Sequence, residues 1–316
     1  MSDSDSDSNP ADPHSSQFIP SSPFNDTDAD VILRSSDGVD FHVYRLVLSL
    51  ASSVFRDMFA FPTPQSEPTI PTVQVSESAL VLDAALRFWY PGAEPTAVQT
   101  LDLLRDALEV LVLKYNMRFV IPLAKQQLRE YIGSDPVAVF SIACRHEWKD
   151  IALDAAKGSL KLPLRAFDEA RPAQLEYMTA GTYHTLLQYH SECAKVATAA
   201  TSSLQWATYL NIPGADCTNW TDPAACPRTG HWSFAHSTMA PLTAWFSTYL
   251  DGATAVLSRC PTASLDSPDL LTLPIAKMGP CSSCRVDGFS GLIKFLDVLR
   301  AKIDKDIGSI ELELNF

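Results

Sequence analysis

A short hairpin pattern constrains the fold of this chain more than any other feature of its sequence. Residues 29–34 (Ala-Asp-Val-Ile-Leu-Arg) form a run rich in strand-forming residues, and residues 35–38 (Ser-Ser-Asp-Gly) have the composition of a turn. Apolar and polar residues then alternate over residues 39–43, as expected for a strand with one buried face. The sequence therefore predicts a β-hairpin at residues 29–43.

Short amphipathic helices and one more strand are predicted after the hairpin. The apolar residues that first recur at helical spacing are Val47, Leu50, Val54 and Met58. Ser52 and Ser53 interrupt this run and can cap a second short helix. A proline-rich loop over residues 61–71 leads to a strand pattern at residues 72–75. Three further helices are expected on the apolar positions Leu82, Leu86 and Trp89; Leu101, Leu104, Leu108, Leu111 and Tyr115; and Ala124, Leu128 and Ile132.

This order of elements, together with the residues at several positions, resembles the BTB/POZ domain family. Asp30 and Val31 match the Asp-Val pair that opens the family's first strand, and residues 41–45 (Phe-His-Val-Tyr-Arg) are similar to the segment leading into its first helix. Residues 48–59 are similar to the family's helical corner, and residues 86–92 to its aromatic helix end. The resemblance covers residues 24–132. With the cysteine-bearing half behind it, the chain looks most like the BTB proteins expanded in basidiomycete fungi.

The resemblance implies a protein-interaction module and not an enzyme. BTB domains dimerise or recruit partners, among them cullin-3 ubiquitin ligase scaffolds and transcriptional corepressors. We therefore expect homo- or hetero-oligomerisation and partner recruitment, in the manner of a scaffold. The alternative is a substrate adaptor for a cullin-3 ubiquitin ligase, in which residues 133–200 form a BACK-like helical extension and the last third binds substrate.

The resemblance also indicates candidate interface residues. In dimeric BTB domains an Asp at the first strand and an Arg at the start of the first helix form a charged pocket at the dimer interface. Asp30 and Arg45 occupy these positions, and an ion pair within the domain is the alternative interpretation. The helices carry more apolar surface than one small core needs, at Leu46, Val54, Phe55, Phe59 and Phe61. Core packing is the default for most of them, and a symmetric dimer would bury the surplus, for which Leu46, Phe55 and Phe59 are the predicted interface residues.

Composition and charge exclude some classes of function. The chain has 316 residues, is 46% hydrophobic and carries a formal net charge of −13. This charge opposes binding to nucleic acids, because such binding depends on clustered Lys and Arg. No run approaches the roughly 20 apolar residues of a membrane span, and the acidic residues 1–23 lack the features of a secretory signal. We expect a disordered tail over residues 1–23, and a cytoplasmic or nuclear protein with no nucleic-acid or membrane partner.

The rest of the chain is predicted to be mainly helical. Asp135 and Pro136 form a strong helix start, and helical patterns continue to about residue 200. Residues 211–240 are rich in Pro, Gly, Thr, Trp and Cys without periodicity, so we expect irregular structure there unless a cross-link orders it. The predicted fold class is α+β. A BTB/POZ domain with a short three-stranded sheet and flanking helices precedes a helical extension (residues 133–200) and a cysteine-containing helical region (residues 201–316).

Six of the seven cysteines follow residue 190, and two of them form a CxxC pair. The thiolates of Cys281 and Cys284 can bind one zinc ion, which needs two more ligands to complete a tetrahedral site. Cys217 and Cys226 are the best candidates, with His231 as a substitute for either. A structural zinc would order the irregular segment. Unligated thiols, or a disulfide between Cys281 and Cys284, are the alternatives.

A zinc-dependent enzyme built on Cys217, Cys226, His231 and Cys284, with one open position on the zinc, is a second alternative function. It would need Asp216 or Asp222 as its general base. Residues 146–150 (His-Glu-Trp-Lys-Asp) lack the second His of a zinc-protease helix, and the sequence contains no glycine-rich phosphate-binding motif. The sequence therefore predicts no catalytic residues, and a structural zinc as its one possible cofactor.

Overall fold

The computed structural model describes residues 18–61, 70–93, 100–164, 178–208, 224–235 and 239–314, except for the side chain of His231. The chain divides into two compact units, Met1–Leu128 and Arg129–Phe316. Residues 1–17 of the predicted acidic tail lie outside the described residues.

The last residues of the predicted tail contact the rest of the first unit. The ring of Phe18 stacks on Phe41 with 6.0 Å between the centroids, and Arg87 Nη2 donates a hydrogen bond to Ser21 Oγ at 2.6 Å. The predicted tail boundary at residue 23 was therefore wrong, because an aromatic residue near the end of the segment has apolar surface to bury.

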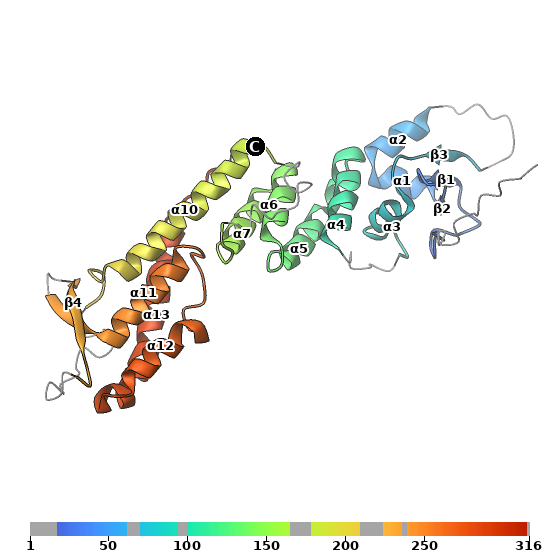
Figure 1. Ribbon diagram of the computed structural model, residues 1–316. Helices are drawn as coiled ribbons and strands as arrows, with labels where there is room; N and C mark the ends of the chain where they lie inside the picture. The colour runs from blue at the N-terminus through green and yellow to red at the C-terminus, as the bar shows by residue number, and fades with distance from the viewer. Residues whose placement is uncertain are drawn as a thin grey trace, which may run out of the picture. The chain divides into compact units, whose positions relative to one another are not determined.

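Strand β1 (Val31–Arg34) is the central strand of the first unit's sheet (Figure 1). It pairs antiparallel with β2 (Asp40–Val43) and parallel with β3 (Thr72–Gln74), so the strand order in the described part is β2-β1-β3. The β1–β2 pair is the hairpin that the sequence predicts. Val31 and Leu33 alternate with more exposed neighbours and are fully buried, so one face of the sheet forms part of the core.

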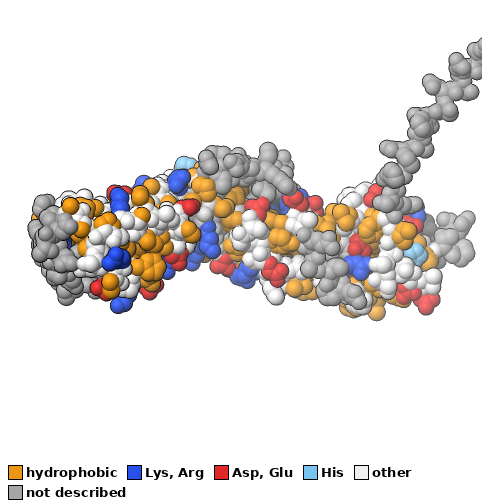
Figure 2. All heavy atoms as spheres, turned by 60° about the horizontal axis from the view of Figure 1, so that its bottom comes forward, with side chains coloured by type: hydrophobic (Ala, Val, Ile, Leu, Met, Phe, Trp, Pro, Cys, Tyr) orange, Lys and Arg blue, Asp and Glu red, His pale blue; other side chains and the backbone are white. Residues whose placement is uncertain are grey.

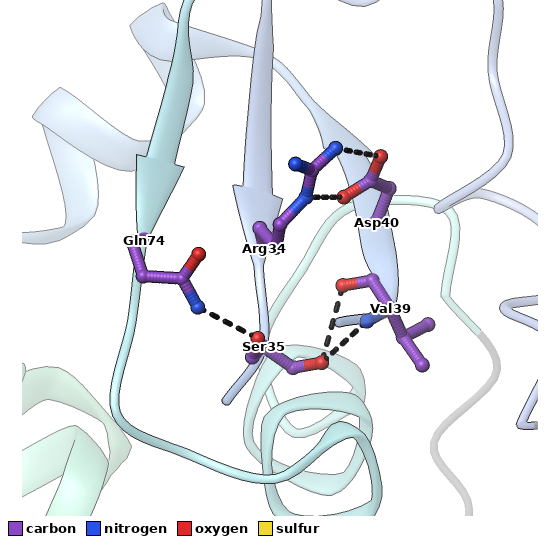
Figure 3. A network of polar contacts seen from close by, with 5 residues as sticks. All are labelled: Arg34, Ser35, Val39, Asp40 and Gln74. Atoms are coloured by element: carbon purple, nitrogen blue, oxygen red, sulfur yellow. Dashed lines mark hydrogen bonds and ion pairs between the residues drawn. The ribbon is translucent and has the colours of Figure 1, made fainter. Parts of the chain in front are cut away.

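Polar contacts fix the turn between β1 and β2 (Figure 3). Arg34 donates from Nε and Nη2 to the carboxylate of Asp40 at 2.6 and 2.7 Å, and these bonds hold the pKa of Asp40 below its ordinary value. The hydroxyl of Ser35 accepts the N–H of Val39 at 2.9 Å, while Gln74 Nε2 donates to the carbonyl of Ser35 at 2.8 Å. The turn is therefore bonded to β3 as well as to β2.

Helices flank this sheet. Helices α1 (Arg45–Ala51) and α2 (Ser53–Ala60) follow β2, and α3 (Ala79–Arg87) follows β3. The later helical segments are α4 (Leu101–Leu108), the π-helix η1 (Glu109–Lys114), the 3₁₀ helix η2 (Arg118–Val120) and α5 (Ile121–Tyr131). The largest fully buried side chains of the unit are Phe24, Leu33, Phe41, Leu48, Phe55 and Leu82.

Ser52 separates α1 from α2, which confirms the break predicted from the sequence. Its hydroxyl accepts the N–H of Phe55 at 3.2 Å, as an N-cap residue does, and donates to the carbonyl of Tyr115 at 2.7 Å. One buried hydroxyl therefore caps α2 and joins it to the residue that follows η1.

The second unit is mainly helical (Figure 1). Its described helices are α6 (Pro136–Arg145), α7 (Lys149–Ser159), α10 (Ala180–Ser202), α11 (Ala244–Leu257), α12 (Pro268–Met278) and α13 (Phe289–Gly308), the last preceded by the π-helix η5 (Cys284–Gly288). Asp135 caps α6 by accepting the N–H of Ala138 at 3.1 Å. Helix α10 packs against α11 and α13, and the rings of Phe246 and Phe295 meet edge to face in this core.

A β-hairpin lies between the helices of the second unit. Strand β4 (Arg228–Ser233) pairs antiparallel with β5 (Met239–Thr243), with an irregularity between Thr229 and Trp232. This corrects the prediction of irregular structure over residues 211–240, of which residues 211–223 and 236–238 lie outside the described residues. The strands escaped prediction because neither alternates clearly and β5 contains Pro241, which only edge strands tolerate.

Within the described residues, the structure contains no helix with the length and apolar character needed to cross a membrane. On the face drawn in Figure 2, acidic and basic side chains are interspersed with hydrophobic ones. The charges on that face are therefore mixed in sign.

Gly158 allows α7 to approach Ile132 closely. A Cβ atom at position 158 would lie 2.5 Å from Cγ2 of Ile132, a β-branched side chain with little freedom to turn away. Alanine favours a helix over glycine by about 1 kcal/mol, but we expect Gly158→Ala to lower the free energy of unfolding by about 1–3 kcal/mol because of this overlap. Urea denaturation followed by circular dichroism measures the change.

Gly308→Ala is the matched control. Gly308 also lies at the end of a helix, and a Cβ atom there would meet nothing within 4 Å. This variant should be as stable as the unmodified chain or slightly more stable. Equal stability of the two variants would contradict close packing at Gly158.

Candidate functional site

Large apolar side chains lie exposed on α1 and α2. Leu46 and Leu50 are 68% and 80% exposed and stand four residues apart, on one side of α1. Val54 and Met58 repeat this spacing on α2, and Phe61 follows directly. We refer to these five residues as the α1–α2 face. Large apolar areas on a protein surface usually mark an interaction site.

Asp30, which directly precedes β1, meets Arg45, the first residue of α1. Oδ1 of Asp30 accepts the backbone N–H of Arg45 at 2.6 Å, so a carboxylate satisfies an open N–H group at the helix N-terminus. The guanidinium of Arg45 lies over the ring of Phe59, 5.0 Å from its centroid. Among the described residues no ion pair joins the two side chains, which corrects the interpretation as an intradomain ion pair.

Phe55 is a core residue. Its ring is 2% exposed and stacks on Tyr115 with 4.4 Å between the centroids. Its prediction as an interface residue was therefore wrong. Phe59 is half-buried and lies between the ring of Phe55 and the guanidinium of Arg45. Of the predicted apolar interface residues, Leu46 has the side chain that is open to a partner.

The sequence pattern gave no sign that Leu50 and Met58 are exposed. These residues helped to locate the two helices, but helical spacing alone does not tell which side of a helix faces the core. The burial of Leu48 and Phe55 shows which side of each helix faces the core.

Tyr44 holds the junction between β2 and α1. Its N–H donates to the hydroxyl of Tyr90 at 2.9 Å, and its own hydroxyl donates to Oδ2 of Asp26 at 2.6 Å. The bond to the carboxylate raises the pKa of Tyr44 to about 12 and lowers the pKa of Asp26. At neutral pH the tyrosine therefore remains a donor and the aspartate an acceptor. The contact fixes the residue from which α1 begins.

Three of the cysteines that the structure describes meet in the second unit. Cys226 lies two residues before β4. Cys281 and Cys284 lie much further along the chain, with 58 residues separating Cys284 from Cys226, at the start of the helical segment that continues into α13. Their Sγ atoms all lie within 4.8 Å of one another, and those of Cys226 and Cys284 are 3.7 Å apart. We refer to these three residues as the thiol cluster. They are three of the four cysteines named as zinc ligands from the sequence.

The other residues named for a zinc site lie outside the described part of the structure. These are Cys217, the side chain of His231, and the two candidate bases Asp216 and Asp222. Two further cysteines, Cys144 and Cys193, are buried in α6 and α10, and burial raises their pKa values to about 12 and about 11. Their thiols stay protonated at neutral pH, as expected for core residues.

Residues 22–131 match the family model of the BTB/POZ domain. This segment is a BTB/POZ domain. The match confirms the resemblance seen over residues 24–132 and includes both the sheet and the α1–α2 face. No curated protein matches the chain. BTB/POZ domains are non-enzymatic protein-interaction modules, so this part of the chain acts through contacts with proteins.

The buried ring of Phe55 should contribute strongly to the stability of the BTB/POZ domain. We expect Phe55→Ala to lower the free energy of unfolding by about 3–5 kcal/mol, because it leaves a cavity beside Tyr115. Leu80→Ala is the control, because Leu80 is 57% exposed on α3, outside the α1–α2 face, and its loss should change stability by no more than about 0.5 kcal/mol. Chemical denaturation of both full-length variants measures the difference. Similar losses in both would contradict the assignment of Phe55 to the core.

Proposed function

We propose that the BTB/POZ domain binds a second copy of this chain through the α1–α2 face, and that the protein acts as an oligomerisation module or scaffold. The observation that carries this proposal is the pair Leu46 and Leu50, two exposed leucines on one side of α1. A second copy offers the same apolar side, so a twofold arrangement covers both pairs at once.

Burial of Leu46 and Leu50 alone is not sufficient for a stable dimer. Full burial of one leucine contributes about 1.5–3 kcal/mol, so four leucines from two copies contribute about 6–12 kcal/mol at most. Association costs about 4–15 kcal/mol in lost translational and rotational freedom. The free energy gained by burying the leucines is therefore about equal to the free energy that association costs. The outer residues Val54, Met58 and Phe61 are therefore needed for a stable dimer.

Charged groups at the start of α1 can orient the two copies. Asp30 is exposed and is held by the N–H of Arg45, while Arg45 is fixed over Phe59. Charges at the edge of an interface add more to orientation and specificity than to affinity. We therefore place Asp30 and Arg45 in the dimer interface, as the family resemblance implies. The two residues are joined by the hydrogen bond from the Arg45 N–H to the Asp30 carboxylate and not by an ion pair.

Self-association is tested by the mass of the full chain in solution. Sedimentation equilibrium should give twice the 34.6 kDa of one chain. The double variant Leu46→Glu, Leu50→Glu should stay folded, because both positions are exposed, and should sediment as a monomer. Leu80→Glu is the control, since Leu80 is an exposed leucine on α3, and it should remain a dimer. A monomeric unmodified chain, or a double variant that stays dimeric, would refute the proposal.

The family resemblance also supports a role as a cullin-3 adaptor. This alternative is tested by a pull-down of purified cullin-3 with the same proteins. If the unmodified chain is monomeric and retains cullin-3, the domain recruits a partner and self-association is replaced as the proposed function. If the chain is a dimer and cullin-3 is not retained, an oligomerisation module or scaffold is the better description.

A further inference from the structure

The spacing of the thiol cluster fits one tetrahedral metal ion. Sulfur atoms bound to a zinc ion at about 2.3 Å lie about 3.8 Å apart at the corners of a tetrahedron. The separation of 3.7 Å between Cys226 and Cys284 is close to this value, and Cys281 lies within the 4.8 Å range of both. A disulfide would instead place two sulfurs about 2.0 Å apart.

Separate parts of the second unit hold these thiols in place. The carbonyl of Pro227, next to Cys226, accepts the N–H of Ala244 at 2.8 Å, which ties the start of β4 to the start of α11. The carbonyl of Cys281 accepts the N–H of Arg285 at 2.9 Å in a first helical turn, so Cys281 and Cys284 are presented at the start of a helical segment. The positive end of a helix dipole favours the thiolate, the form that binds metal.

The surroundings of the cluster suit buried thiolates. Cys281 and Cys284 are 3% and 2% exposed. A pocket of ≈ 270 Å³ beside the cluster is lined by Cys226, Cys281, Trp245 and Lys277. Nε1 of Trp245 is buried and has no hydrogen-bond acceptor among the described residues. The indole N–H of Trp245 and the ammonium group of Lys277 are both of a kind that can stabilise a metal-bound sulfur without binding the metal.

We propose that Cys226, Cys281 and Cys284 bind one zinc ion as thiolates. Each thiol that binds gives up its proton to the solvent. Thiolates select zinc over magnesium and calcium, which prefer oxygen ligands. We assign no fourth ligand from the structure, because Cys217 and the side chain of His231 lie outside its described residues.

The zinc ion acts as a cross-link between the β4–β5 hairpin and the segment that leads into α13. A hairpin of two strands is only marginally stable by itself, and residues 211–240 lack a regular hydrophobic pattern. The ion adds a cross-link to the packing of Phe234 and Leu242, two buried apolar side chains of the hairpin region. Removal of zinc should therefore destabilise the second unit and leave the BTB/POZ domain folded.

The metal content of the full chain tests the proposal. The chain is purified without a histidine tag and without chelator, and its metals are measured by inductively coupled plasma mass spectrometry. We expect about one zinc ion per chain, and loss of that zinc in Cys226→Ser, Cys281→Ser and Cys284→Ser. Cys260→Ser is the matched control, because Cys260 is a half-buried cysteine of the same unit outside the cluster, and it should keep the zinc.

A second measurement uses the unmodified chain, so it does not depend on the folding of a variant. Alkylation of the native protein with iodoacetamide is followed by peptide mass spectrometry, with and without a zinc chelator. Chelation should increase labelling of Cys226, Cys281 and Cys284 and leave Cys260 unchanged. Four results would each overturn the proposal. The purified chain contains no zinc; it contains iron or copper in place of zinc; all three serine variants retain the zinc; or Cys281 and Cys284 form a disulfide.

Discussion

The pairing of β1 with strands on both of its sides is the constraint on which the BTB/POZ domain depends. The register that joins Val31 to Val43 sets Asp30 beside the residues that follow β2. The carboxylate of Asp30 can then accept the N–H of Arg45 and begin α1 at that residue. With its start fixed, α1 turns Leu48 into the core and Leu46 and Leu50 outward. The apolar face of the domain is thus set by the register of two strands.

The sequence predicted the elements of this domain better than it predicted their orientation. Alternation over residues 39–43 and the turn before it were sufficient for the hairpin, because a strand with one buried face repeats every second residue. Helix α1 has only seven residues, and its leucines at 46, 48 and 50 do not single out one side. Phe55 and Phe61 are chemically identical, yet only the first is buried. That distinction arises from Tyr115, which lies far along the sequence.

One helix predicted from the stripe Leu101, Leu104, Leu108, Leu111 and Tyr115 proved to have two parts. The α-helical hydrogen bonding of α4 gives way to a π-helix at Glu109, and the N–H of Tyr115 donates to the carbonyl of Val110 at 2.9 Å. The apolar stripe marks the buried side correctly but does not reveal the wider turn. The wider turn ends at the tyrosine that stacks on Phe55 and whose carbonyl accepts the Ser52 hydroxyl.

In the second unit, the sequence named Cys226, Cys281 and Cys284 as ligands of one possible zinc ion, but it did not predict the structure that brings them together. Cys281 and Cys284 are recognisable as a pair from their spacing, whereas Cys226 is 58 residues from Cys284. Their proximity depends on the β4–β5 hairpin, and the sequence pattern did not predict that hairpin. A contact between distant residues requires the tertiary structure when the segments that carry them lack a regular hydrophobic repeat.

The short length of α1 and α2 has a consequence for biosynthesis. Helices of seven and eight residues are not stable in water without tertiary contacts. Phe55 finds its stacking partner only after the segment ending at Tyr115 has been synthesised. A chain still on the ribosome therefore cannot display an ordered apolar side on α1 until most of the domain has emerged. Any contact that requires an ordered α1 can therefore form only after this part of the domain has been synthesised.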